Sequence, residues 1–156
     1  MAAIPPITGI AEIVLSVRDL PAVRQFYVDV LGFPVHSEIC LEQVDAADPE
    51  GDATISFLTI RELQTPIGPL HPQLLVLIDY QRHAFARERF TGHNLTTSTL
   101  NHLAFEIPPD SYDAHLARLQ SLDLNPREMV FPDMNARAIF IADPEGNDLE
   151  LICAAL

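Results

Sequence analysis

One segment near the C-terminus joins a tight turn to a strand: Asp143-Pro144-Glu145-Gly146-Asn147-Asp148-Leu149-Glu150-Leu151-Ile152. The Asp-Pro pair opens the turn, and the Gly-Asn pair tolerates the positive φ that a chain reversal needs. A β-hairpin is therefore predicted, with one strand over 138–142 and the other over 148–153. Within the second strand the two leucines face one side of the sheet and Glu150 faces the other.

Glu150 is the unusual residue of this strand. A carboxylate in the middle of an apolar strand either faces solvent or points into a cavity where its charge has a partner. The strand alone leaves both interpretations open.

Outward from this hairpin, the apolar pattern predicts the same order of elements twice. Short β-branched or alternating runs indicate strands, and apolar residues at helical spacing after a start signal indicate helices. The predicted strands cover 10–17, 33–41, 54–60, 73–79, 99–107, 128–131, 137–142 and 148–153, and helices follow the start signals at 18–21 and 108–111. The turn at 45–52, the loop at 64–72 and a polar crossing segment at 80–92 separate these elements.

The predicted order is strand, helix and three strands, used twice, which is an α+β fold of two βαβββ modules. Laying Glu12 on His102 superposes the two predicted helices to within a residue, so the halves resemble a divergent internal repeat.

Composition limits the possible partners. The chain has 156 residues and a net charge of -13, from 22 acidic residues against nine arginines and no lysine. Nucleic acid and anionic membranes are therefore not expected partners, and Schiff-base lysine chemistry is excluded. Two cysteines, Cys40 and Cys153, are too few for a disulfide framework. With no apolar run long enough to span a bilayer and no signal peptide, a soluble, cytoplasmic protein is expected.

Three polar side chains occupy matched positions near the starts of predicted strands: Glu12, His102 and Glu150. If each helix packs on the apolar side of its own sheet, all three face the opposite side. They are predicted to converge on one site. The alternative is that they belong to solvated polar faces.

The Asp-Pro-Glu-Gly-Asn turn followed by Leu-Glu-Leu resembles the C-terminal signature of the vicinal-oxygen-chelate superfamily, which includes glyoxalase I, bleomycin-resistance proteins and extradiol dioxygenases. The resemblance covers nearly the whole chain. It implies a single domain over 7–156 whose sheets curl into a cup, with module one at about 7–80, a crossing segment at about 81–97 and module two at about 98–154. It also implies a homodimer.

The resemblance further implies four ligand positions for a divalent ion. Glu12, His102 and Glu150 match three of them, and Gln73 matches the fourth if its Gln-Leu-Leu run is aligned with the family pattern. Otherwise Val76 occupies that position and the protein supplies three ligands. Such an oxygen-rich set suits Ni, Co, Mn, Mg or Fe(II), or Zn with extra coordination.

The function implied is a metal-dependent enzyme that acts on a small molecule with adjacent oxygens, by glyoxalase, lyase or isomerase-like proton transfer. Glu12 is the predicted base, with Glu150 as its counterpart. Two departures from known members matter: Glu12 stands where extradiol dioxygenases carry His, and Ser16 stands where glyoxalase I commonly has an Arg for glutathione. An extradiol-type dioxygenase and a metal-free ligand-sequestering protein of the bleomycin-resistance type remain as alternatives.

Overall fold

The computed structural model describes residues 9–40, 53–61, 72–83, 86, 94 and 98–154. The predicted turn at 45–52 and most of the loop at 64–72 lie outside the described residues, as does much of the crossing segment. The chain divides into two compact units, unit 1 over residues 1–92 and unit 2 over residues 93–156, and each is described by itself.

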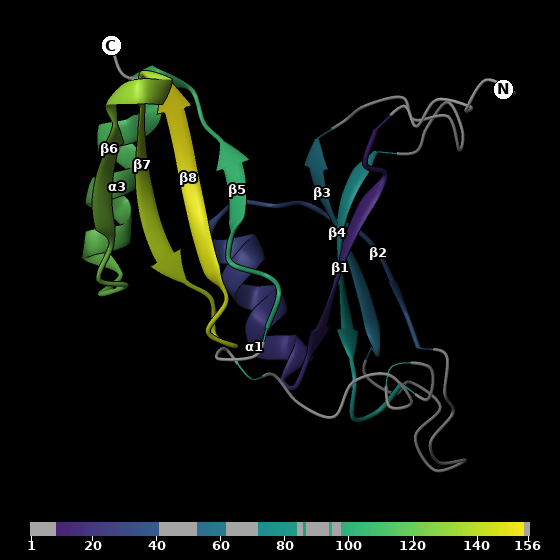
Figure 1. Cartoon of the computed structure of the whole chain (residues 1–156). Helices are drawn as coiled ribbons and strands as arrows, with labels where there is room; N and C mark the ends of the chain where they lie inside the picture. Colours follow the sequence, from purple (N-terminus) through teal and green to yellow (C-terminus); the bar gives the residue numbers. More distant parts are fainter. Residues whose placement is uncertain are drawn as a thin grey trace, which may run out of the picture. The chain divides into compact units, whose positions relative to one another are not determined.

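Unit 1 is a four-stranded sheet with one helical segment. Its elements are β1 (Glu12–Val17), α1 (Leu20–Gln25), the π-helical turn η1 (Phe26–Val30), β2 (Val35–Ile39), β3 (Ile55–Arg61) and β4 (Gln73–Asp79). The strand order is β1-β4-β3-β2, and β1 runs parallel to β4 while the other pairs are antiparallel (Figure 1).

Unit 2 repeats this arrangement. Its elements are β5 (Leu103–Glu106), the 3-10 turn η2 (Pro109–Ser111), α3 (Tyr112–Ser121), β6 (Arg127–Phe131), η3 (Pro132–Met134), β7 (Ala136–Ala142) and β8 (Asp148–Ala154). The strand order is β5-β8-β7-β6, again with one parallel pair, β5 and β8. The predicted α+β fold of two βαβββ modules is confirmed.

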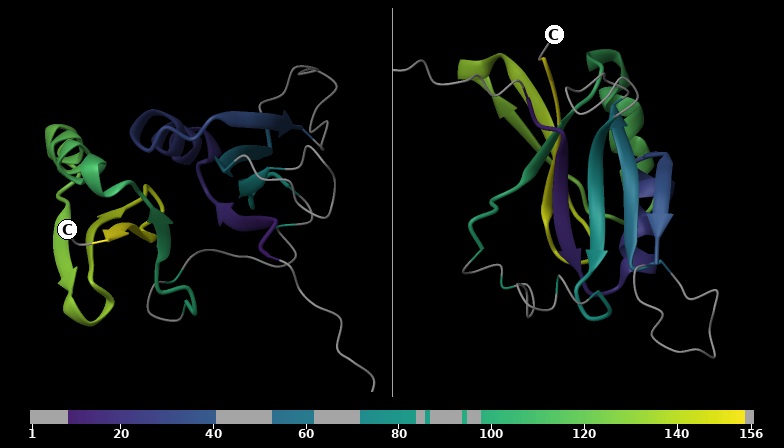
Figure 2. Two further views of the ribbon diagram at one scale, coloured as in Figure 1. Left: turned by 90° about the horizontal axis from the view of Figure 1, so that it is seen from above. Right: turned by 90° about the vertical axis from the view of Figure 1, so that its right-hand side faces the viewer.

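Local sequence explains where the first helix begins and ends. Asp19 accepts a hydrogen bond from the Ala22 backbone N–H through Oδ1 at 3.0 Å, which caps α1. Gly32, at φ +76°, ends the helical segment where an L side chain would be strained. The segment lies on one face of the unit 1 sheet (Figure 2), and its Val23 and Tyr27 side chains are fully buried.

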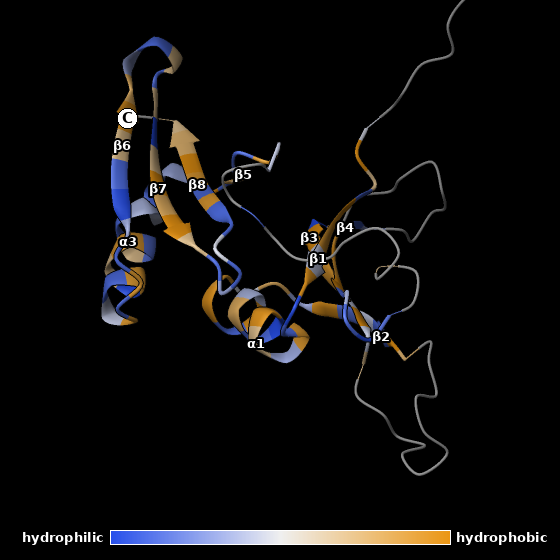
Figure 3. Cartoon of the chain, turned by 60° about the horizontal axis from the view of Figure 1, so that its bottom comes forward, coloured by the Kyte–Doolittle hydropathy of each residue, from blue (hydrophilic) through white to orange (hydrophobic). Residues whose placement is uncertain are grey.

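We call the other side of each sheet, turned away from its helix, the helix-distal face. In unit 1 this face carries a buried hydrophobic cluster. Its members are Ile55, Leu74, Val76, Ile78, Tyr80 and Ala86, with Phe57 packed against them. The strongly hydrophobic β3 and β4 that supply most of it stand out in Figure 3. The interior of the unit 1 sheet is thus mainly apolar, with Ser56 and Thr59 of β3 as buried polar residues.

In unit 2, α3 lies behind β6 and β7 in the view of Figure 1. The Tyr112 hydroxyl donates to the Ala138 carbonyl at 3.3 Å and to Glu128 Oε2 at 3.2 Å, and the Arg137 guanidinium lies 3.9 Å from the centre of the Tyr112 ring. Leu119 of the same helix is 1% exposed. These contacts hold α3 on one face of the unit 2 sheet, so α3 does not cover the helix-distal face.

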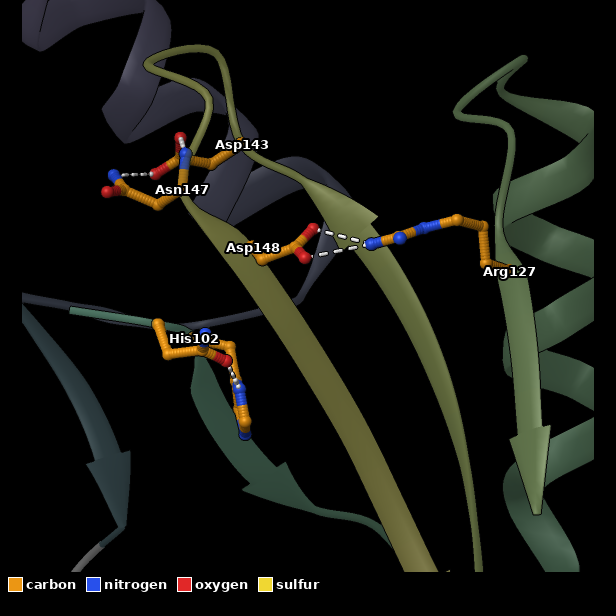
Figure 4. A network of polar contacts seen from close by, with 6 residues as sticks. His102, Arg127, Asp143, Asn147 and Asp148 are labelled. Carbon is orange, nitrogen blue, oxygen red and sulfur yellow. Dashed lines mark hydrogen bonds and ion pairs between the residues drawn. The ribbon is translucent and has the colours of Figure 1, made fainter. Parts of the chain in front are cut away.

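The hairpin predicted from the opening stretch is confirmed. Asp143 Oδ1 accepts the backbone N–H of Glu145 and of Asn147, and Oδ2 accepts the Asn147 side-chain amide, each at 2.9 Å. Gly146 has φ +87°, as the turn requires. Figure 4 shows Asp143 and Asn147 paired at the turn and Asp148 paired with Arg127 at the start of β8.

The predicted strand over 99–107 is shorter in the structure. Ser98 Oγ accepts the Leu100 backbone N–H at 3.1 Å, so this segment turns before the strand begins at Leu103. The Ile107 N–H still reaches the Ile152 carbonyl at 2.9 Å, and Pro108, which has no N–H, ends the pairing. None of the described helices is long and apolar enough to cross a membrane.

Candidate functional site

Strand register places Glu150 on the helix-distal face of unit 2. Glu150 pairs with Ala104 of β5 on one side and with Phe140 of β7 on the other, so the three side chains form one row across the sheet. The leucines on either side of Glu150 are buried on the helix side. The alternation predicted from the sequence is confirmed.

His102 lies beside Glu150. Its Nε2 atom is 3.1 Å from Glu150 Oε2, although the residues are far apart in sequence. The Glu150 side chain is 6% exposed and the His102 side chain 37% exposed. A nearly buried carboxylate therefore contacts an imidazole on the segment that leads into the neighbouring strand β5, and Glu150 does not lie on a solvated face of unit 2.

Asn101 orients the imidazole. The His102 Nδ1 and Asn101 Oδ1 atoms are 2.7 Å apart, and a carbonyl oxygen can only accept, so Nδ1 carries a proton in this contact. The lone pair or second proton of His102 is thereby assigned to Nε2, which faces Glu150. The Phe140 ring meets the His102 ring edge-on, with centroids 5.8 Å apart and an interplanar angle of 81°.

A cavity of about 350 Å³ opens over this pair. Asn101, His102 and Glu150 supply its polar wall. The remaining walls are apolar and come from Met129, Phe131, Met134, Phe140 and Ile152. A concave, mainly apolar pocket with a few convergent polar groups is the usual form of a small-molecule site.

A larger cavity of about 400 Å³ lies on unit 1 between α1 and β2, lined partly by Arg24 and Glu38. These two side chains pair with each other, and Ser56 donates to the same carboxylate oxygen at 3.1 Å. The Arg24–Glu38 pair of that hollow is thus engaged within itself, and we place the candidate site in unit 2.

Glu12 begins β1 and is exposed on the helix-distal face of unit 1. Its register partner is Leu74, and the next row of that face pairs Val14 with Val76. Glu12 therefore stands in unit 1 where His102 stands in unit 2, as the internal repeat predicts.

The strand register bears on whether Gln73 or Val76 occupies the fourth ligand position of the family pattern. Gln73 precedes Leu74, so strand alternation turns it to the side opposite Glu12, and its Nε2 donates to the Ile10 carbonyl at 3.3 Å. Val76 occupies the position in unit 1 that Glu150 occupies in unit 2. Val76 pairs with Val14, two residues after Glu12, and Glu150 pairs with Ala104, two residues after His102. The register favours the alternative in which Val76 holds this position.

Sequence reasoning missed the residues that shape the cavity. Ile152 and Phe140 were within reach, since strand alternation and the hairpin register place both on the Glu150 face. Met129, Phe131 and Met134 come from β6 and the turn after it, whose pairing the sequence did not fix. Asn101 carries no signal beyond its place next to His102.

The donor set of unit 2 fits a divalent cation in part. Two ligand atoms at right angles on bonds of about 2.1 Å lie about 3 Å apart, close to the His102–Glu150 separation. Imidazole nitrogen and carboxylate oxygen are both ordinary ligands of such ions. Within the described part of unit 2 no third His, Cys, Asp or Glu joins the pair. Unit 2 therefore supplies two ligands, and any further ligands come from elsewhere.

These features define a class: a protein of two βαβββ modules with an imidazole and a carboxylate paired on a helix-distal face. Residues 9–151 match the model of the Glyoxalase/Bleomycin resistance protein/Dioxygenase superfamily. The chain belongs to this superfamily, and the predicted resemblance is confirmed.

Individual relatives agree with this assignment. The chain is 30% identical over 142 residues to the uncharacterized protein YaeR of Escherichia coli K12, covering 90% of this chain and 92% of that protein. Among solved structures, lactoylglutathione lyase from Agrobacterium tumefaciens matches with a TM-score of 0.62 and 22% identity over 94% of each chain.

A mutant of the fosfomycin resistance protein FosX from Listeria monocytogenes, complexed with Mn(II) and 1S,2S-dihydroxypropylphosphonic acid, matches with a TM-score of 0.63 and 18% identity. The match covers 97% of this chain and 95% of that one. At such identities these two structures share the fold with this chain.

Proposed function

We propose that this protein is a divalent-metal-dependent enzyme that acts on a small molecule with adjacent oxygens, by proton transfer of the glyoxalase, lyase or isomerase type. The two units would form one domain over residues 7–156, with Glu12 of unit 1 completing the ligand pair of unit 2. The observation that carries the proposal is the contact of His102 Nε2 and Glu150 Oε2 at 3.1 Å, at the polar end of an apolar cavity.

A bound divalent ion would supply Lewis-acid polarisation of the adjacent oxygens. His102, Glu150 and Glu12 are the residues that would hold it. Gln73 stays a prediction from the family alignment, and its engagement with the Ile10 carbonyl and its side of the strand argue for a three-ligand protein set. The native metal among Ni, Co, Zn, Mn, Mg and Fe(II) is left to measurement.

Glu12, Glu150 and Asn101 would each have a separate role in the proton transfer. Glu12, exposed at the start of β1, is the proposed base that takes a proton from a carbon next to a carbonyl and returns it. Glu150, nearly buried, contributes fixed negative charge. Asn101 keeps the Nε2 atom of His102 directed at Glu150, and the apolar walls border the polar end of the cavity.

The relatives support the coarse proposal. A FosX structure contains Mn(II), and another neighbour is a lactoylglutathione lyase. Glutathione as co-substrate is not proposed here, because Ser16 stands where glyoxalase I commonly has its Arg. The family precedent also favours a homodimer, which size-exclusion chromatography with light scattering would test.

The test is Mn(II) binding to purified full-length protein stripped of metal. Calorimetric titration of the wild type should show about one ion per chain, and His102→Ala and Glu150→Gln should each weaken binding by at least about a hundredfold. Glu12→Gln should weaken it less, by about tenfold. Glu106→Gln is the matched control, because Glu106 lies exposed one row from Glu150 on the same face and should leave binding unchanged.

Two results would overturn the proposal. Wild-type protein that binds no divalent ion while retaining small-molecule binding would make this a metal-free sequestering protein. Binding that is equal in wild type, His102→Ala and Glu150→Gln would place the metal elsewhere. If metal binds as expected, oxygen uptake with catechols, measured against turnover of α-hydroxycarbonyl compounds, separates a dioxygenase from a proton-transfer enzyme.

A further inference from the structure

We infer that the substrate carries its adjacent oxygens on an uncharged apolar body of about the size of a phenyl ring, and is not a phosphonate or another anion. This inference rests on the proposed function and names the substrate class of the same site. It is drawn from the wall of the unit 2 cavity, because that wall decides what can accompany two oxygens placed at His102 and Glu150.

The described cavity wall is apolar everywhere except at its polar end. Beyond its polar end, the described wall consists of two aromatic rings, two thioethers and one isoleucine side chain. Its volume of about 350 Å³ suits a small ligand and not a large conjugate. An apolar group gains from leaving water for such a wall, whereas a charged group loses its hydration and gains no hydrogen bond.

Phe140 is a preformed platform next to the polar pair. Its ring is held on one side by the edge-on contact with His102, centroids 5.8 Å apart, and on another by the Arg127 guanidinium, 5.6 Å from the ring centre. It is also the cross-strand partner of Glu150. A flat apolar group resting on Phe140 would therefore place attached oxygens beside His102 and Glu150.

The charges near the wall disfavour an anion. Arg127 is the arginine in the Glu150 row of this face, and its Nη2 atom donates to both Asp148 oxygens at 2.7 and 2.9 Å. Its charge is thus already matched by a carboxylate. Beyond its polar end, the described wall of the cavity therefore offers no cationic side chain to an anionic substrate group.

The two methionines lie at the open part of the wall. Met129 is 50% exposed and Met134 is 66% exposed. Thioether side chains adapt to different apolar shapes, so this part of the wall can close over a ring without a specific partner. The fixed ring of Phe140 and the adaptable methionines together favour an apolar body over a polar one.

The experiment compares three probes with full-length protein, with and without Mn(II): hydroxyacetone, 2-hydroxyacetophenone and 1,2-dihydroxypropylphosphonate. The first two differ by a phenyl group in place of a methyl group. We expect 2-hydroxyacetophenone to bind about tenfold more tightly than hydroxyacetone, and the phosphonate to bind most weakly, as measured by calorimetry.

A charge placed on the wall tests the same inference from the other direction. Met129→Arg should tighten phosphonate binding by about tenfold and weaken 2-hydroxyacetophenone binding by a similar factor. Val130→Arg is the matched control. Val130 is 66% exposed on the same strand but faces the helix side of the sheet, so this substitution adds the same charge away from the cavity. Neither residue is buried, so both variants should fold.

The outcomes separate the two proposals. Tightest binding of the phosphonate to wild type, or equal binding of the two hydroxyketones, would overturn this inference even if Mn(II) binds as proposed. Absence of Mn(II) binding would overturn the proposed function, while the preference for the phenyl compound would still be measured in the metal-free protein. Equal effects of Met129→Arg and Val130→Arg would show that the cavity wall is not the site of selection.

Discussion

Units 1 and 2 have the same strand order and differ in what their helix-distal faces carry. At the position where unit 2 has Glu150, unit 1 has Val76, and the two are 5% and 3% exposed. Around Val76 the face is a hydrophobic cluster, whereas around Glu150 it opens into a cavity. One architecture therefore supports a closed apolar face and a mainly apolar pocket with a polar end, depending on which side chains occupy the same rows.

The comparison also shows what a buried carboxylate requires. Glu150 is tolerated because His102 Nε2 lies 3.1 Å away and a cavity gives room for a ligand. Val76 has only apolar neighbours in its cluster. In unit 2 the contact with His102 offsets the free energy needed to bury the Glu150 carboxylate. In unit 1 an uncharged residue, Val76, occupies the same position.

The largest effect on stability is expected from placing a glutamate in unit 1 at Val76, the position that matches Glu150 of unit 2. Val76→Glu should lower the free energy of unfolding by about 3–5 kcal/mol, because it buries a carboxylate among apolar side chains without a partner. Val14→Glu is the control, since Val14 is paired with Val76 but 47% exposed, and should change stability by less than about 0.5 kcal/mol. Urea denaturation at neutral pH measures both. A Val76→Glu protein as stable as wild type would mean that unit 1 already offers a partner for a carboxylate.

The next effect concerns the turn that feeds β8. Asp143→Ala should cost about 2–4 kcal/mol, because it leaves the backbone donors of Glu145 and Asn147 without their acceptor. Asp143→Asn keeps the Oδ1 acceptor and should cost less than half as much. The free energy of unfolding of the two variants is compared by urea denaturation. An equal loss in both would show that the charge or the Oδ2 acceptor of Asp143, both of which Asn lacks, stabilises the turn more than the Oδ1 acceptor does.

A smaller effect is expected from the residue that orients the imidazole. Asn101→Ala should weaken Mn(II) binding by about tenfold, since His102 loses the acceptor that fixes its tautomer. Asn101→Asp, which keeps an acceptor oxygen, should restore binding. Nitrogen-15 NMR of His102 in metal-free protein provides a separate readout, because the proportion of Nδ1-protonated imidazole should fall in Asn101→Ala. An unchanged tautomer would remove Asn101 from this role.

The smallest effect lies on the helix side of unit 2. Tyr112→Phe should cost about 1 kcal/mol at neutral pH, through loss of the hydrogen bonds to Glu128 and to the Ala138 carbonyl. Burial, followed by the hydrogen bond from Tyr112 to Glu128, raises the pKa of the Tyr112 hydroxyl from 10.0 to about 12.

The unfolded chain therefore releases this proton first as the pH rises. The stability that Tyr112 contributes is complete below pH 10 and declines between pH 10 and about pH 12. Tyr112→Phe should lack this part of the alkaline loss, which unfolding curves at pH 8 and pH 11 would show. Parallel loss in wild type and variant would assign the alkaline transition to other groups.

The sequence predicted the elements well because their signals are local. Period-two alternation in 148–153 places Glu150 opposite the leucines without reference to any other strand. The cap at Asp19 and the stop at Gly32 act within one helical turn of the residues they affect. The strand over 99–107 was predicted too long, because a Ser98 hydroxyl competes for a backbone N–H that the apolar pattern had assigned to the strand. The strands predicted over 10–17 and 33–41 also begin two residues later in the structure, at Glu12 and Val35.

The site was predicted less completely because it depends on register. The alignment of Gln73 with the family pattern stays a prediction, but the register opposite Glu12 favours Val76 at the matching row. The apolar walls from β6 and η3 needed the pairing of Met129 with Ala138 and of Phe131 with Ala136. No spacing along the chain specifies such pairs, since a shift of one residue would turn the whole strand over.

Local sequence signals specify the order of strands and helices, the repeated module, the turn before β8 and the sides of the strands on which Glu12 and Glu150 lie, because each depends on neighbouring residues and a fixed period. The packing of distant segments is what brings His102 and Glu150 to 3.1 Å, orients the imidazole through Asn101 and surrounds the pair with two phenylalanines and two methionines. Those contacts arise from strands paired across long separations, where register and burial, and not local preference, set the distances.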